Sequence, residues 1–149
     1  MMTASPWPLP LPRVLEILHR DAALEGRYSR AAWALLLICY CGLIFYLSDR
    51  SMVAVPDLFS WQDKFIHALA YALMAFFFWS AAVGAISTHA KLALLTLLFC
   101  AIYGATDEWH QSFIAGRDAS LFDWLADITG ALLLTAALWK RERGLLERE

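Results

Sequence analysis

Ionisable side chains stand at helical spacing where long apolar segments of this chain begin or end. Neighbours three and four residues apart share one face of an α-helix, and three such rows can be traced. They are Asp63, His67 and Tyr71, with Lys64 beside them; Tyr103, Asp107, His110 and Gln111; and Asp123 and Asp127, followed on the same side by Gly130. Charged groups inside a membrane are costly unless they are paired or hydrated. We therefore expect the rows to face one another and form a polar pocket, with Gly130 close to a neighbouring helix.

The histidines of these rows can carry protons, because imidazole titrates near neutral pH. Either His67 or His110 is predicted to transfer protons. Asp107 or Asp123 is predicted to orient that imidazole. These residues are the candidates for catalysis.

Basic side chains near the rows are predicted to bind an anion. Lys64 can hold a phosphate or carboxylate as a point charge, and Arg117 can do so through a bidentate fork. The other residues predicted to contact substrate are Asp63, Tyr71, Glu108, Gln111 and Asp127. Glu108 lies about 100° from Asp107 around a helix, so an alternative is that it faces the lipid headgroups.

No cofactor is predicted, and no residue is assigned as a metal ligand. A divalent metal stays an open alternative, because histidine and aspartate are common ligands but show no diagnostic motif such as His-Glu-x-x-His here. No serine or cysteine stands at a suggestive spacing from a histidine, so no nucleophile is identified. Whether the protein is an enzyme is left open at this point.

The composition indicates a membrane protein. Of the 149 residues, 60% are hydrophobic and the mean hydropathy is +0.53. Soluble domains have roughly 45–50% apolar residues, so the excess here requires an apolar solvent such as lipid. The net charge of -2 is too small to indicate a nucleic-acid partner.

Four apolar segments are each near the length of about 20 residues that crosses a hydrocarbon core as a helix. They are roughly 31–47, 65–86, a segment from near Leu92 through 103–113, and 121–139. The predicted fold is therefore all-α, a four-helix transmembrane bundle. The membrane domain is expected to cover residues 31–139.

The two ends of the chain are expected to lie outside this bundle. Residues 1–30 are predicted to be a cytoplasmic proline-rich start and a short amphipathic helix on the membrane surface, over about 13–29. A short soluble helix is the alternative for that segment. Residues 140–149 are predicted to be a basic cytoplasmic tail. The start lacks the basic region and cleavage site of a signal peptide.

The distribution of basic residues predicts the orientation. The flanks of the bundle hold Arg13, Arg20, Arg27, Arg30, Lys140, Arg141, Arg143 and Arg148, whereas the first and third loops hold only Arg50, Lys64 and Arg117. Cytoplasmic segments carry the excess of lysine and arginine. Both termini are therefore expected in the cytoplasm, and the polar pocket is expected on the outer face of a bacterial cytoplasmic membrane.

Two sequence blocks resemble a known family. Residues 63–71 read Asp-Lys-x-x-His-x-x-x-Tyr, residues 107–111 read Asp-Glu-x-His-Gln, and Gly116, Arg117, Asp123 and Gly130 follow in order. This pattern, over about residues 43–135, is similar to that of the VanZ-like family, named for a membrane protein associated with teicoplanin resistance. Asp127 stands where the family commonly has asparagine, which adds a titratable group. The resemblance implies a cell-envelope protein linked to glycopeptide resistance, but no defined reaction.

The function expected from the residues is binding of, or chemistry on, an anionic lipid or a lipid-linked saccharide at the outer leaflet. One alternative is a non-enzymatic assembly or lipid-binding factor whose polar cluster is structural or docks a partner. A small transporter is a second alternative, disfavoured because the inner half of the bundle has almost none of the ionisable residues that a proton path needs. The oligomeric state is not predicted.

Overall fold

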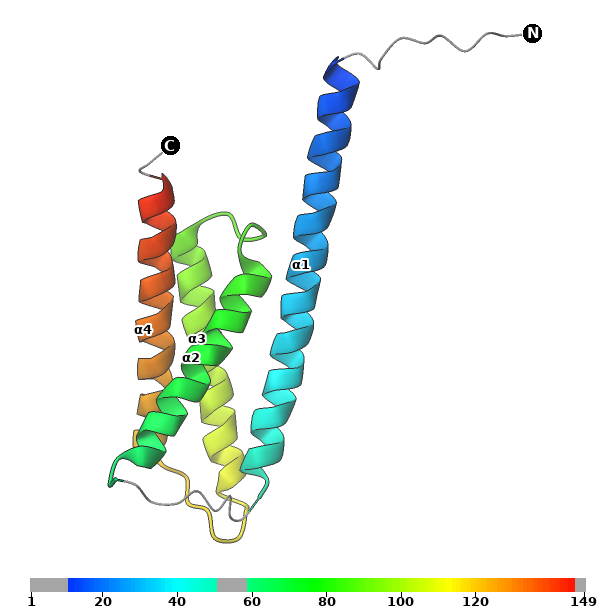
Figure 1. Cartoon of the computed structure of the whole chain (residues 1–149). Helices are drawn as coiled ribbons and strands as arrows, with labels where there is room; N and C mark the ends of the chain where they lie inside the picture. Colours follow the sequence, from blue (N-terminus) through cyan, green and yellow to red (C-terminus); the bar gives the residue numbers. More distant parts are fainter. Residues whose placement is uncertain (1–10, 51–58, 147–149) are drawn as a thin grey trace, which may run out of the picture.

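The computed structural model describes residues 11–50 and 59–146, and the side chains of residues 26–50 and 59–144 within them. It consists of α1 (Leu11–Ser48), α2 (Gln62–Ala82), α3 (His89–Gln111) and α4 (Leu121–Leu146), shown in Figure 1. No strand occurs in these ranges. The predicted all-α class and the four-helix arrangement are confirmed.

All four helices are long and apolar enough to cross a membrane. The spans are Gly26–Ser48, Gln62–Ala82, His89–Gln111 and Leu121–Gly144. Large apolar side chains such as Leu35, Ile38 and Leu133 are exposed on the outside of the bundle. Lipid is the solvent in which such a surface is stable. The chain is therefore a multi-pass membrane protein.

One end of the bundle collects the polar rows. α1 ends there, α2 begins, α3 ends and α4 begins, while α1 begins and α4 ends toward the opposite end (Figure 1). We call this the loop end, defined by Ser48, Gln62, Gln111 and Leu121. The predicted gathering of polar residues from distant parts of the sequence at one end of the bundle is confirmed.

The tightest helix contact joins α2 and α4. A Cβ atom placed on Gly130 would lie 2.5 Å from the carbonyl carbon of Ala68 and 2.8 Å from its Cα, and closer still to its carbonyl oxygen. Gly130 therefore permits the two backbones to touch, which confirms the predicted close approach. The contact holds the turn of α4 that carries Asp127 beside the turn of α2 that carries His67.

Local sequence signals end the helices. α2 ends at Ala82, and Gly84 turns the chain with a φ of 76°, a conformation that favours glycine. Thr88 then caps α3, since its Oγ1 accepts a hydrogen bond from the backbone N–H of Lys91 at 3.2 Å. The second apolar segment was predicted to extend to residue 86, and this glycine turn explains why the helix is shorter.

The structure does not support a separate amphipathic helix over residues 13–29. α1 is one continuous helix from Leu11 to Ser48, so the chain has no break in the helix near residue 30. The sequence has no proline between Pro12 and Pro56, and an isolated glycine such as Gly26 is tolerated inside a helix. α4 likewise continues to Leu146, into the segment predicted as a tail.

Candidate functional site

The polar rows of α2 and α4 meet at the loop end. Lys64 Nζ forms an ion pair with Asp123 Oδ1 of α4 and lies 3.0 Å from Asp63 Oδ2 of its own helix. Asp123 is buried, whereas the Asp63 side chain is 65% exposed. The prediction that the rows face one another is confirmed. Lys64, predicted to hold a ligand phosphate, already contacts two carboxylates.

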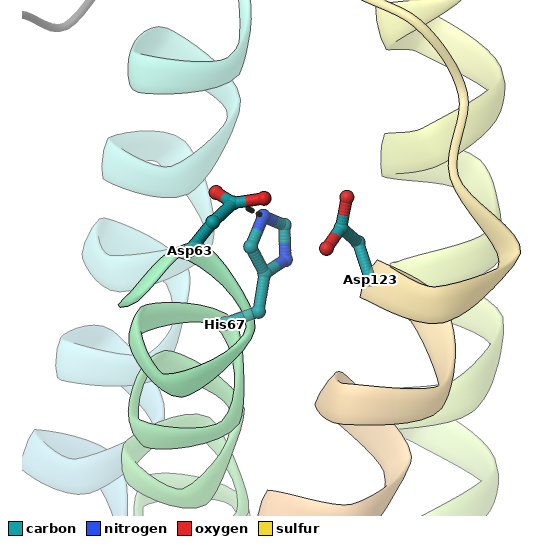
Figure 2. Close-up of side chains that lie close together, drawn as sticks. All are labelled: Asp63, His67 and Asp123. Carbon is teal, nitrogen blue, oxygen red and sulfur yellow. Dashed lines mark ion pairs between the residues drawn. The ribbon is translucent and has the colours of Figure 1, made fainter. Parts of the chain in front are cut away.

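His67 is held by a buried carboxylate. Its Nδ1 lies 3.0 Å from Asp127 Oδ1, and its Nε2 lies 4.0 Å from Asp63 Oδ1. Figure 2 shows the imidazole between Asp63 of α2 and Asp123 of α4. When Nδ1–H donates to Asp127, Nε2 faces Asp63 and carries a lone pair in the neutral ring or a second proton in the imidazolium. The prediction that Asp107 or Asp123 orients the histidine is wrong for His67, because Asp127 takes that position.

Asp107 pairs within its own helix. Its Oδ2 accepts a hydrogen bond from Gln111 Nε2 at 3.0 Å, and both side chains are buried. Among the described residues, it makes no hydrogen bond to a histidine. Asp107 therefore contributes a buried carboxylate to the site without orienting an imidazole.

Glu108 is buried, so the alternative that it faces the headgroups is wrong. Its Oε2 accepts a hydrogen bond from the backbone N–H of Ser120 at 2.7 Å, and only 7% of the residue is exposed. The angular separation from Asp107 was correct. However, the loop before α4 folds back over the side of α3 that carries Glu108. The side of Asp107 and the side of Glu108 are therefore both covered by protein.

His110 lies apart from His67. Its ring stacks on Phe45 of α1 with a centroid distance of 4.7 Å, and its Nε2 is 3.4 Å from Asp49 Oδ1. It lines a separate cavity of about 340 Å³ between α1 and α3, to which Asp107 also contributes. The structure therefore does not bring the two candidate histidines into one site.

Arg117 joins the loop between α3 and α4 to the end of α1. Its Nε donates to the carbonyl of Arg50 at 3.1 Å, and its Nη2 donates to the carbonyl of Leu47 at 3.3 Å. Carbonyls at the C-terminal end of a helix lack partners within the helix, so these bonds satisfy them. They use only part of the five N–H donors of the guanidinium.

A cavity of about 390 Å³ at the loop end unites six of the predicted site residues. Its polar lining includes Asp63, His67, Tyr71, Asp107, Gln111 and Arg117, and apolar side chains of Ile44, Leu47, Ile66 and Ala70 line another part. The other predicted site residues, Lys64, Glu108, His110, Asp123 and Asp127, are not part of this lining. The site thus has two parts: the cavity, and a group of ionisable residues in the surrounding helices that do not line it.

Two groups of side chains have the composition and spacing of metal ligands. One is Asp63, His67 and Asp123 (Figure 2), and the other is His67, Glu108 and Asp127. Within each group, the potential ligand atoms lie within 4.8 Å of one another. The second group draws on three helices, and for that reason no linear motif revealed it.

Gly104 is a site residue that sequence reasoning missed. A Cβ atom on it would lie 3.0 Å from Asp127 Oδ2 and 3.3 Å from Tyr71 Cε1. The absence of a side chain at Gly104 therefore lets the Asp127 carboxylate of α4 lie against α3. The available signal was its position three residues before Asp107, on the same face of the helix.

The fold and the site together define a multi-pass helical membrane protein with an ionisable cluster and a cavity at one end. No family model, curated protein or solved structure matches the chain. The resemblance to the VanZ-like family stays a prediction from the sequence.

Proposed function

We propose that this protein is a component of the bacterial cytoplasmic membrane whose loop end binds the anionic headgroup of a membrane lipid or of a lipid-linked envelope precursor. The basic flanks favour cytoplasmic termini and hence an outward-facing loop end. The observation that carries the proposal is the cavity of about 390 Å³, where Arg117, His67 and Gln111 lie beside apolar side chains.

The cavity lining suits an amphiphile. Ile44, Leu47 and Ile66 provide an apolar wall, while Arg117 offers a planar fork for phosphate or carboxylate. The volume is in the lower part of the range of about 300–1,000 Å³ typical of ligand pockets. It would accommodate a headgroup, with the hydrocarbon chains remaining in the bilayer.

His67 is the residue suited to acid–base chemistry on such a headgroup. Asp127 fixes Nδ1, which leaves Nε2 on the side of Asp63 and the cavity. This carboxylate–imidazole arrangement sets the tautomer as it does in general acid–base sites. We therefore propose binding as the function and His67 as the residue that exchanges a proton with the bound headgroup.

Replacing Arg117 with lysine tests the proposed headgroup site. Lysine keeps the positive charge but loses the fork, so we expect the affinity for phosphatidylglycerol to fall about tenfold, which corresponds to ~1.4 kcal/mol. Native mass spectrometry of the purified protein, titrated with phosphatidylglycerol or phosphatidylcholine, measures this.

The matched control for that experiment is Arg143→Lys, because Arg143 is exposed near the end of α4 that is opposite the site. It should bind phosphatidylglycerol like the native protein. Equal affinity of the Arg117→Lys variant and the native protein would contradict a headgroup site at Arg117. A native protein that does not prefer phosphatidylglycerol over phosphatidylcholine would contradict the proposal for this lipid class.

A structural role for the charged cluster is the alternative that a specific observation favours. Two contacts, Lys64 with Asp123 and His67 with Asp127, join α2 to α4, the two helices that pack most closely. If holding helices together were their whole role, their loss would lower stability and leave headgroup binding per folded molecule unchanged. The Arg117→Lys experiment tests headgroup binding without changing the α2–α4 contacts, because Arg117 connects the loop between α3 and α4 to the end of α1.

The proposed orientation can be tested at Asp118, which is exposed in the loop between α3 and α4. We expect Asp118→Cys, in a chain whose three native cysteines are replaced by alanine, to react with a membrane-impermeant maleimide in intact spheroplasts. A cysteine at Arg143 should react only after the membrane is opened. The reverse labelling pattern would overturn cytoplasmic termini.

A further inference from the structure

The loop end has more buried carboxylates than cationic side chains to neutralise them. Asp107, Glu108, Asp123 and Asp127 are all buried there. Lys64 pairs with Asp123, and Arg117 donates to backbone carbonyls rather than to a carboxylate. Among the described residues, the cationic partner left for Glu108 and Asp127 is His67.

Apart from Asp123 Oδ1, which forms the ion pair with Lys64, two of these carboxylate oxygens lack a hydrogen-bond donor within the described part of the chain. They are Glu108 Oε1 and Asp127 Oδ2, each on a residue that is more than nine-tenths buried, with 7% and 1% exposure. Anionic oxygens without a donor are expensive in a low-dielectric interior. Either protons or a cation must compensate them.

The residues that carry these oxygens converge with His67 at a spacing that fits a metal ion. His67, Glu108 and Asp127 come from α2, α3 and α4, and each offers a ligand atom within 4.8 Å of the others. His67 Nδ1 and Asp127 Oδ1 are 3.0 Å apart. Two ligands at the usual metal distance of about 2.1 Å are separated by about 3 Å when they subtend a right angle at the metal.

The neighbouring group of Asp63, His67 and Asp123 is a weaker candidate. Figure 2 shows that these side chains do converge, but Lys64 Nζ already pairs with both carboxylates of this group. A divalent cation there would have to displace an ammonium group and would be repelled by it. Lys64 has no ion pair with Glu108 or Asp127, so the deeper group does not have this competitor.

We propose that His67, Glu108 and Asp127 form a binding site for one divalent transition-metal ion. Two carboxylates and one imidazole balance the charge of the ion. The imidazole ligand favours Zn²⁺ over Mg²⁺ and Ca²⁺, and the two carboxylates also suit Mn²⁺. Three protein ligands leave coordination positions open, as in catalytic rather than structural zinc sites. The metal site shares His67 with the proposed headgroup site, but the headgroup titration is read at Arg117, which is not a metal ligand. A metal on Nδ1 would replace the hydrogen bond to Asp127 and leave Nε2 on the side of Asp63.

Metal binding can be measured on the purified full-length protein with a tag that contains no histidine. After treatment with EDTA, the protein is equilibrated with Mn²⁺ or Zn²⁺ under reducing conditions, with Mg²⁺ as a comparison. We expect about one Mn²⁺ or Zn²⁺ per chain by elemental mass spectrometry, and a rise of about 5 °C in Tm. Mn²⁺ has little affinity for thiols, and the loss of the sharp six-line electron paramagnetic resonance signal of the free ion measures its binding directly.

Two aspartates that flank the same histidine provide the matched pair of variants. Asp127→Asn should abolish stoichiometric binding and the Tm rise, whereas Asp63→Asn should retain both. In EDTA, Asp127→Asn should melt near the temperature of the native protein, because the amide oxygen can still accept a hydrogen bond from His67 and the unpaired anionic oxygen is removed. Should Asp127→Asn not fold, Glu108→Gln carries the same prediction.

Three results would overturn the proposal. They are a native protein that takes up neither Mn²⁺ nor Zn²⁺, stoichiometric binding by both Asp127→Asn and Glu108→Gln, and loss of binding in Asp63→Asn. The first result would mean that protons neutralise the carboxylates. The last would place the metal in the group of Asp63, His67 and Asp123 shown in Figure 2. None of them bears on the phosphatidylglycerol titration, so the two proposals fail separately.

Discussion

Replacing Gly130 with alanine is expected to lower the free energy of unfolding by about 3 kcal/mol or more. The new Cβ would lie 2.5 Å from the carbonyl carbon of Ala68 and 2.8 Å from its Cα. These are backbone atoms of a packed helix, so no side chain can rotate away, and α2 and α4 must separate. Overpacking typically costs about 1–3 kcal/mol and occasionally more, and a clash with backbone atoms belongs above that range, at about 4 kcal/mol. The gain of about 1 kcal/mol in helix propensity from glycine to alanine offsets part of this cost.

Gly42 provides the control for this prediction. It lies in α1, is exposed, and a Cβ atom there would meet nothing within 4 Å. Gly42→Ala should therefore be neutral or slightly stabilising in the same assay. Both variants can be compared by thermal melting in detergent and by the yield of monodisperse protein. Equal Tm values for Gly130→Ala and Gly42→Ala would show that α2 and α4 do not touch at Ala68.

Replacing Lys64 with methionine should destabilise the protein by about 3 kcal/mol. Breaking a buried ion pair costs about 3–5 kcal/mol, because the remaining charge is stranded. The lower end of this range applies, because the pair is only partly buried: the Lys64 side chain is 30% exposed and the Asp123 side chain is 12% exposed. Asp63 stays hydrated after the change, so the cost comes from Asp123. Reversible unfolding in mixed micelles measures the free-energy difference.

A second substitution identifies the cause of that loss. Lys64→Met combined with Asp123→Leu removes the stranded charge and should recover at least half of the lost stability. Lys91→Met is the matched control, because Lys91 is exposed and forms no ion pair with the described residues. A double variant that is less stable than Lys64→Met would mean that Asp123 contributes through other contacts.

The sequence was sufficient to predict the four apolar helices and that their polar rows face one another. Apolar segments of membrane-spanning length specify helices, because lipid leaves the backbone no other way to satisfy its polar groups. The spacing of four between Asp63 and His67, and between Asp123 and Asp127, placed each pair on one face. Burial of charge then required the two faces to meet. Gly130 identified where the backbones approach.

The same reasoning could not predict how α3 is rotated against its neighbours. Angles within one helix follow from its sequence, and Glu108 does lie on a different side from Asp107. What encloses each side depends on the path of the loop that brings Ser120 to Glu108. The separation of His110 from His67 has a similar origin, because α1 supplies Phe45 and Asp49 as partners for His110. Partners of this kind arise only from packing in three dimensions.

For the proposed headgroup site, the hydrogen bonds of Arg117 make anion binding and the docking of α1 linked equilibria. Its guanidinium donates to the carbonyls of Leu47 and Arg50, so an anion that takes those donors competes with the end of α1. By thermodynamic reciprocity, an anion that loosens this end of α1 must bind more tightly when α1 is already loosened. A bilayer that favours a different tilt of α1 would thus change the headgroup affinity without touching the cavity itself.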